Sequence, residues 1–104
     1  MRIYIAGPMS GFDNFNFPAF FAADEYLKKF GHEVFNPAQK DIDEWGDLET
    51  IKKKANYRDC MRKDLNCILD WAEAIYLLKG WEQSRGAQIE KALAEVLNLE
   101  IMYE

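Results

Sequence analysis

Two acidic residues occupy positions where a carboxylate could do chemistry, Glu90 and Asp64. Glu90 lies near the start of a predicted helix, and its neighbours at i−4, i−3 and i+4 are all small: Gly86, Ala87 and Ala94. A glycine at a helix start weakens the helix by about 1 kcal/mol relative to alanine, which a closely approaching ligand or backbone would explain. On spacing alone, a ligand-contacting carboxylate and a solvated glutamate beside a tight helix–sheet contact are equally supported.

Asp64 falls within a second predicted helix, from Tyr57 to Trp71, on or beside its apolar stripe. The stripe consists of Tyr57, Met61, Leu65 and Ile68. Removing an unpaired carboxylate from water is costly, so Asp64 must be paired, hydrogen-bonded, protonated or directed into a cleft. The structural alternative to a functional role is a helix cap or an ion pair, for which the candidate cations are Arg58, Arg62 and Lys63.

Two carboxylates that reach one cleft are the usual equipment for breaking a glycosidic bond through an oxocarbenium-like transition state. The same pair can cleave an N-glycosidic bond. A carboxylate that attacks C1′ traps the sugar as a covalent glycosyl-enzyme, which water or an acceptor base then discharges. The sequence pattern does not choose between these outcomes.

The elements that must position Glu90 form a strand, a turn and a helix. The run from Ala74 to Leu78 is unbroken and apolar, as in a strand covered on both faces, and Ser84 is a good N-cap for the helix that follows. In open α/β sheets, ligands bind at such carboxyl ends of strands. Trp81 lies in the turn, where a wall that stacks on a base and a simple loop anchor are equally supported.

The whole chain alternates strands and helices. Strands are predicted over Arg2–Ala6, His32–Phe35, Ala74–Leu78 and Leu99–Tyr103, and helices over Phe17–Phe30, Tyr57–Trp71 and Arg85–Leu97. This order predicts an α/β protein with a parallel sheet and crossover helices. We expect a flavodoxin-like (Rossmann-type) three-layer sandwich, with four to five strands and the first strand central.

The segment between Gln39 and Asn56 is predicted to be polar and irregular, with Trp45 and Gly46 at its centre. A loop of that length in a small domain is usually functional or disordered. If this segment is functional, we expect it to act as a mobile lid over the carboxyl ends of the strands.

Composition narrows the possible roles of this single predicted domain, residues 1–104. A net charge of −5 argues against a surface that binds duplex nucleic acid, and no apolar stretch approaches the ~20 residues that cross a bilayer. Cys60 and Cys67 form no CxxC and His32 is the only histidine, so a zinc site is not expected. We interpret both cysteines as reduced thiols of a cytoplasmic protein, and the chain enters a strand directly after Met1 rather than a signal peptide.

Several motifs resemble the nucleoside 2-deoxyribosyltransferase-like superfamily, and more narrowly a small branch of uncharacterised proteins common in phages and prophages. The motifs are Tyr4-Ile5-Ala6-Gly7-Pro8-Met9-Ser10-Gly11, Asn16-Phe17-Pro18-Ala19-Phe20, Asn36-Pro37-Ala38, Asp64-Leu65-Asn66 and Ser84-Arg85-Gly86-Ala87-Gln88-Ile89-Glu90. The resemblance covers nearly the whole chain. Its most specific parts are the first strand with its turn and the block from Ser84 to Glu90.

The resemblance implies roles for the two carboxylates. In the deoxyribosyltransferases and the related deoxynucleoside 5′-monophosphate N-glycosidases, the glutamate matching Glu90 is the nucleophile at C1′. The aspartate matching Asp64 contacts the sugar and assists proton transfer. The chemistry implied needs no metal and no cofactor.

The resemblance also implies binding residues. A serine and a glycine in the places of Ser84 and Gly86 bind the 5′-phosphate of the monophosphate glycosidases, as suits a helix N-terminus. The glycosidases have an arginine where this chain has Ser10, and Arg85 is the candidate to replace it. Gly7, Met9 and Gly11 match the turn that lines the sugar and base site.

The function expected is cleavage or transfer at the N-glycosidic bond of a deoxynucleoside or its 5′-monophosphate. The alternative is a nucleotide-binding or sequestering module of phage origin without turnover. Tyr4 is interpreted as a core residue in preference to an active-site hydroxyl. Because the domain is small, we expect a homodimer or higher homo-oligomer to complete the pocket.

Overall fold

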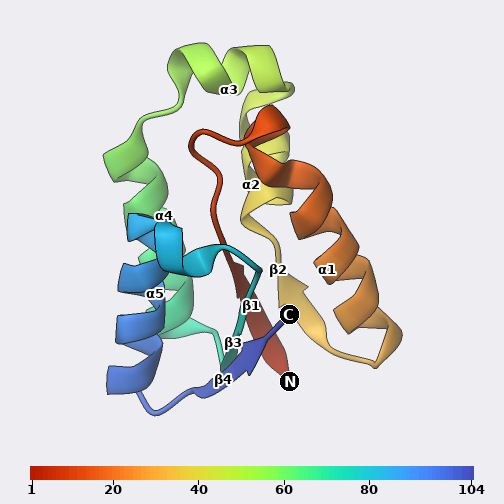
Figure 1. The fold of residues 1–104 in the computed structure, drawn as a ribbon, viewed down its shortest axis with the longest axis vertical. Helices are drawn as coiled ribbons and strands as arrows, with labels where there is room; N and C mark the ends of the chain where they lie inside the picture. Colours follow the sequence, from red (N-terminus) through yellow and green to blue (C-terminus); the bar gives the residue numbers. More distant parts are fainter.

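The computed structural model describes residues 1–104 and has the predicted α/β architecture. Four strands form one parallel sheet in the order β2-β1-β3-β4, so that β1 (Arg2–Ala6) is an inner strand. Figure 1 shows the sheet between two helical layers, with α4 and α5 on one side and α1 on the other. This three-layer arrangement is flavodoxin-like.

The remaining elements have the following bounds: α1 Phe17–Lys29, β2 Glu33–Phe35, α2 Pro37–Trp45, α3 Leu48–Lys54, α4 Tyr57–Asp70, β3 Ala74–Leu77, α5 Arg85–Val96 and β4 Glu100–Tyr103. Two short 3₁₀ turns, η1 (Asp13–Asn16) and η2 (Trp81–Gln83), precede α1 and α5. Every predicted strand and helix outside the segment 39–56 is present, and no end is shifted by more than one residue. None of the helices combines the length and the apolarity needed to cross a membrane.

Side chains of the inner strands alternate between two cores because successive residues of a strand point to opposite faces. Ile3 and Ile5 of β1 pack with α1, whereas Tyr4 and Ala6 face α4 and α5. The strands β1 and β3 are buried on both faces. That burial explains why the run from Ala74 is uniformly apolar rather than alternating.

The prediction of an irregular segment from Gln39 to Asn56 is wrong. The chain there forms α2 and α3, each with its own N-cap: the Asn36 side chain accepts from the backbone N–H groups of Ala38 and Gln39, and Asp47 accepts from Thr50. Such caps satisfy backbone donors that a helix leaves free at its start. The lid expected from an unstructured loop is therefore replaced by two short helices beside the carboxyl ends of the strands (Figure 1).

Candidate active site

A cavity of about 430 Å³ opens at the carboxyl ends of β1 and β3. It lies where the first-strand turn, the start of α2, α4 and the start of α5 meet. The lining residues that carry polar side chains are Tyr4, Ser10, Tyr57, Asp64, Gln83, Ser84, Arg85 and Glu90. Both carboxylates selected from the sequence therefore reach one cavity.

Glu90 is buried, with 6% of its surface exposed, and the Tyr4 hydroxyl donates a hydrogen bond of 2.6 Å to its Oε2 atom. Tyr4 comes from β1 and Glu90 from the second turn of α5, so the sheet and the helix hold the pair together. One carboxylate oxygen is fixed by the hydroxyl. The hydroxyl thus belongs to the site, although the sequence favoured a purely structural tyrosine.

Burial dominates the electrostatics of Glu90. Desolvation raises its pKa from 4.5 to about 8, the Tyr4 hydrogen bond opposes that rise, and the negative charge of Asp64 adds to it. The pKa of Tyr4 is also raised well above its usual value, first by burial and then by Glu90. Both shifts favour a protonated Glu90 and a neutral Tyr4 at neutral pH.

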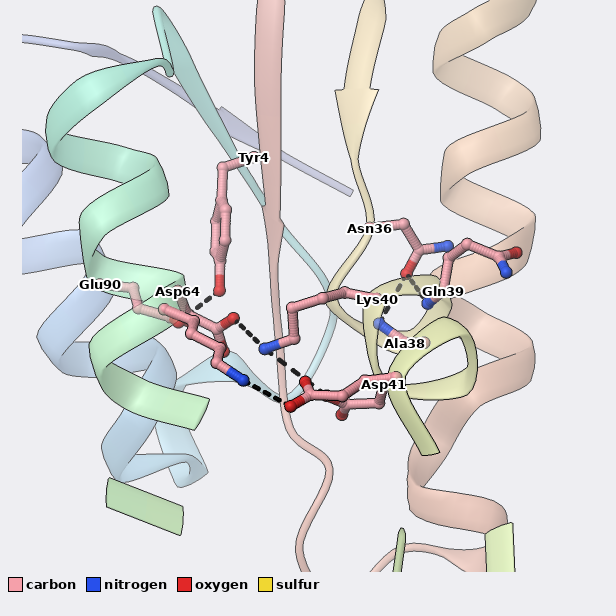
Figure 2. A network of polar contacts seen from close by, with 10 residues as sticks. Tyr4, Asn36, Ala38, Gln39, Lys40, Asp41, Asp64 and Glu90 are labelled. Atoms are coloured by element: carbon pink, nitrogen blue, oxygen red, sulfur yellow. Dashed lines mark hydrogen bonds and ion pairs between the residues drawn. The ribbon is translucent and has the colours of Figure 1, made fainter. Parts of the chain in front are cut away.

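Asp64 has different surroundings, which Figure 2 shows. Its Oδ1 atom accepts a hydrogen bond of 2.7 Å from the Lys40 ammonium, which also lies 3.5 Å from an oxygen of Asp41. The pKa of Asp64 is raised from its usual value of 3.8, because desolvation outweighs the opposing effect of the Lys40 ammonium. The ion-pair partner is thus Lys40 of α2, and none of the cations suggested by the sequence of α4.

The N-terminus of α5 forms one wall of the cavity. Ser84 caps the helix by accepting from the backbone N–H of Ala87, and Arg85 is exposed beside it. A Cβ atom at Gly86 would lie 3.1 Å from the Tyr57 hydroxyl oxygen, so glycine permits the close approach of α4 and α5 there. The absence of a side chain at Gly86 therefore allows α4 and α5 to pack closely at the cavity wall.

Gly7, Met9 and Ser10 line the cavity, as do Ser84, Arg85 and Gly86. At Gly7 a Cβ atom would lie 2.7 Å from the Cβ of Leu78, so this glycine is required by packing against β3.

Two residues expected to bind substrate do not line the cavity, Gly11 and Trp81. Gly11 is exposed in a left-handed conformation (φ +82°), which assigns it to the turn. The Trp81 ring packs near Tyr103, with 6.2 Å between centroids, and the Lys91 ammonium lies 5.3 Å from its centre. These contacts favour the loop-anchor interpretation of Trp81 over the base-stacking one.

Cys60 and Cys67 are free thiols of α4 and half-buried. Burial raises the pKa of Cys67 to about 11, so this thiol is a poor nucleophile at neutral pH. No cluster of three or more histidine, cysteine, aspartate or glutamate side chains is arranged to hold a metal ion. The reactive groups of the cavity are its two carboxylates and the groups that contact them.

Sequence reasoning missed the part of the site supplied by α2. Asn36 followed by Pro37 is a recognisable start of a helix, with an N-cap and proline in the first turn. A helix beginning there places Lys40 one turn from the cap. That signal was present in the sequence, whereas the contact between Lys40 and Asp64 joins two separate helices and has no local signature.

Fold and site together define a flavodoxin-like α/β protein with a two-carboxylate cavity at its strand ends. The chain belongs to the family of the domain of unknown function DUF4406, whose model matches residues 1–103. No curated protein matches the chain.

Proposed function

We propose that this protein cleaves or exchanges the N-glycosidic bond of a deoxynucleoside or a deoxynucleoside 5′-monophosphate. The observation that carries the proposal is the pairing of Tyr4 with Glu90 in the same cavity that Asp64 lines. An oriented carboxylate and a second carboxylate able to handle protons are what such a reaction requires. The resemblance to the deoxyribosyltransferase-like superfamily, carried by the block from Ser84 to Glu90, assigns the same roles.

The reaction proceeds by displacement at C1′. A Glu90 oxygen forms a bond to C1′ as the bond from C1′ to the base nitrogen breaks, and the electron pair leaves with the base, which takes up a proton. Because Glu90 is protonated in the empty site, its proton must leave before attack. Asp64 is the carboxylate of the same cavity that can accept this proton and pass it to the base. Water, or a second base, then discharges the glycosyl ester and regenerates Glu90.

The cavity has polar and apolar lining that suits the two parts of a nucleotide. At the α5 N-terminus, the Ser84 hydroxyl, free backbone N–H groups and Arg85 favour an anionic 5′ group. The apolar part of the lining suits the flat face of a base. It is formed by Ile5, Pro8, Met9, Phe12, Phe20 and Pro37.

The test is incubation with a panel of deoxynucleosides and their 5′-monophosphates, followed by chromatography for free base. We expect base release by the wild-type protein and its loss in Glu90→Ala, with a reduction of at least about 10⁴-fold. Circular dichroism must show that the variant is folded. Turnover retained in a folded Glu90→Ala protein would exclude Glu90 as the nucleophile.

A second candidate function is nucleotide binding or sequestration without turnover, which is what a phage-type member would do with the same pocket. The raised pKa of Glu90 favours it, because a protonated glutamate acts as a hydrogen-bonding group rather than as a nucleophile. Thermal stabilisation by a nucleotide with no free base released would support this function. Base release would exclude it.

We also propose that the protein acts as a homodimer or higher homo-oligomer in the cytoplasm. The exposed apolar residues of α5, Ile89 and Val96, would suit a subunit contact, and the free thiols suit a reducing compartment. Sedimentation should show an assembly larger than one chain. A monomer at micromolar concentration would contradict the proposal.

A further inference from the structure

Lys40 lies between two largely buried carboxylates, that of Asp64 in the cavity and that of Asp41 beside the cavity. Its side chain is 17% exposed, and those of Asp64 and Asp41 are 13% and 10% exposed. The neighbouring Lys63 is paired instead with Glu44 and has 47% of its side chain exposed. Two lysines near Asp64 thus differ sharply: one is enclosed with the carboxylate, and the other lies in solvent.

The position of Lys40 is fixed by α2 and by what holds that helix. Asn36 caps α2, and its amide nitrogen donates a 3.0 Å hydrogen bond to Asp24 of α1. Asn36, Pro37 and Ala38 are buried. The start of the helix is anchored in the core. The backbone of Lys40, one turn later, is therefore held in place, and its side chain points toward Asp64 (Figure 2).

Asp64 is faced by charged or titratable groups from every element packed around it: Tyr4 of β1, Lys40 and Asp41 of α2, Cys60, Lys63 and Cys67 of α4, and Glu90 of α5. Two carboxylates buried in one cavity do not both ionise readily, because each charge disfavours the other. An ammonium in direct contact with only one of them decides which carboxylate carries the charge.

We propose that Lys40 is a positioning residue of the site, which keeps the Asp64 carboxylate ionised and oriented, so that of the two carboxyl groups Glu90 is the one that holds a proton. The ammonium contacts Asp64 directly and has Asp41 as a second partner. Nothing in this charge assignment depends on the reaction. It is a property of the empty site.

The catalytic consequence rests on the proposed function. An ionised Asp64 is ready to accept the proton that Glu90 must lose before attack, and later to deliver it to the departing base. Without Lys40, Asp64 would hold a proton in a larger share of the molecules, and a carboxyl group that already holds a proton cannot accept one from Glu90. The lysine touches no reacting atom in this scheme and acts through Asp64.

The test is a carbon-13 NMR titration of the Asp64 and Glu90 side-chain carboxyl groups, assigned with Asp64→Asn and Glu90→Gln. The proteins compared are the wild type, Lys40→Met and the matched control Lys63→Met. We expect Lys40→Met to raise the proton affinity of Asp64 by about tenfold or more, and Lys63→Met to change it by less than about twofold. An Asp64 titration that moves no further in Lys40→Met than in the control overturns the proposal.

Two other variants keep the test decisive if Lys40→Met does not fold. Lys40→Gln preserves a hydrogen-bond donor without the charge and should also raise the proton affinity of Asp64, whereas Lys40→Arg keeps the charge and should retain the wild-type order of titration. A wild-type midpoint for Asp64 in Lys40→Gln would overturn the proposal.

Where base release is observed, Lys40→Met should lower kcat more than it changes KM, and Lys40→Arg should restore part of kcat. If no substrate is turned over, the proposed function fails while the titration still decides the role of Lys40.

Discussion

The two carboxylates of the cavity occupy contrasting surroundings. Glu90 lies in an enclosed position where its contact is the neutral Tyr4 hydroxyl, and burial raises its pKa to about 8. Asp64 is also buried, but an ammonium lies 2.7 Å away. The difference illustrates how the elements around each side chain, rather than the side chains themselves, can decide which of two carboxyl groups holds a proton more tightly.

The largest effect expected from this contrast is on stability at different pH values. The folded protein binds the Glu90 proton more tightly than the unfolded chain does, because the pKa rises from 4.5 to about 8 on folding. The contribution of Glu90 to the free energy of unfolding should therefore be constant below pH 4.5. It should then fall by about 5 kcal/mol in total as the pH rises from 4.5 to 8. Urea unfolding of the wild type and Glu90→Gln at pH 5 and pH 8.5 measures it.

Glutamine keeps the shape of Glu90 and accepts from Tyr4, but it has no charge to desolvate. The variant should thus be more stable than the wild type at pH 8.5, with a much smaller difference at pH 5. Equal stability differences at the two pH values would show that Glu90 is not a buried titrating group.

The next effect concerns Asp64. Asp64→Asn should lower the rate of base release by about 10²-fold, the size typical of losing a positioned proton-transfer group. Its charge raises the pKa of Glu90, so its removal should also shift the rising limb of the pH–rate profile to lower pH. A limb that moves to higher pH would contradict the assignment of charge to Asp64.

Tyr4→Phe should act in the opposite direction on the same limb. The hydroxyl lowers the pKa of Glu90, so its loss should move the limb to higher pH. At pH values where Glu90 is ionised, loss of the hydrogen bond should also cost about 2 kcal/mol of unfolding free energy. Shifts of the rising limb in opposite directions in Asp64→Asn and Tyr4→Phe would support the contrast between the two carboxylates. Shifts in the same direction would contradict it.

The smallest effect concerns the cap that anchors α2. Asn36→Ala should lower the free energy of unfolding by about 1 kcal/mol, as expected for a lost N-cap. Asn56→Ala is the matched control, because Asn56 caps α4 by accepting from Asp59. Asn36→Ala should lose more stability than Asn56→Ala in urea unfolding, because Asn36 is buried and also donates to Asp24, and only Asn36→Ala should alter the titration of Asp64. An Asp64 titration altered equally in both would mean that Lys40 is not held through α2.

Most of the fold could be predicted because its elements carry strong local patterns. The apolar run from Ala74 and the cap at Ser84 are each decided by neighbouring residues. The prediction for the segment 39–56 is wrong because its helices are short and polar. The caps Asn36 and Asp47 are the stronger signals of helix there. A capping signal read together with the proline at 37 would have revealed α2.

Only part of the site, the two carboxylates, could be predicted from the sequence, and the reason is physical. Glu90 and Asp64 stand out because an acid on a largely apolar or small-residue face needs an explanation. Lys40 does not, since a lysine in a polar segment is ordinarily solvated. Its contact with Asp64 joins α2 to α4 and depends on how two layers meet. Trp81 is the converse case, because its place in the turn left a ligand contact and a loop anchor equally open, and only the fold shows that its ring packs near Tyr103 and does not line the cavity.

The measurement that tests the central claim most directly is the carboxyl titration of the wild-type protein by carbon-13 NMR. Glu90 should take up its proton near pH 8, and Asp64 should remain ionised to a lower pH than Glu90. A Glu90 carboxyl that titrates near 4.5, or an Asp64 carboxyl that takes up its proton at higher pH than Glu90, would contradict the division of roles between them.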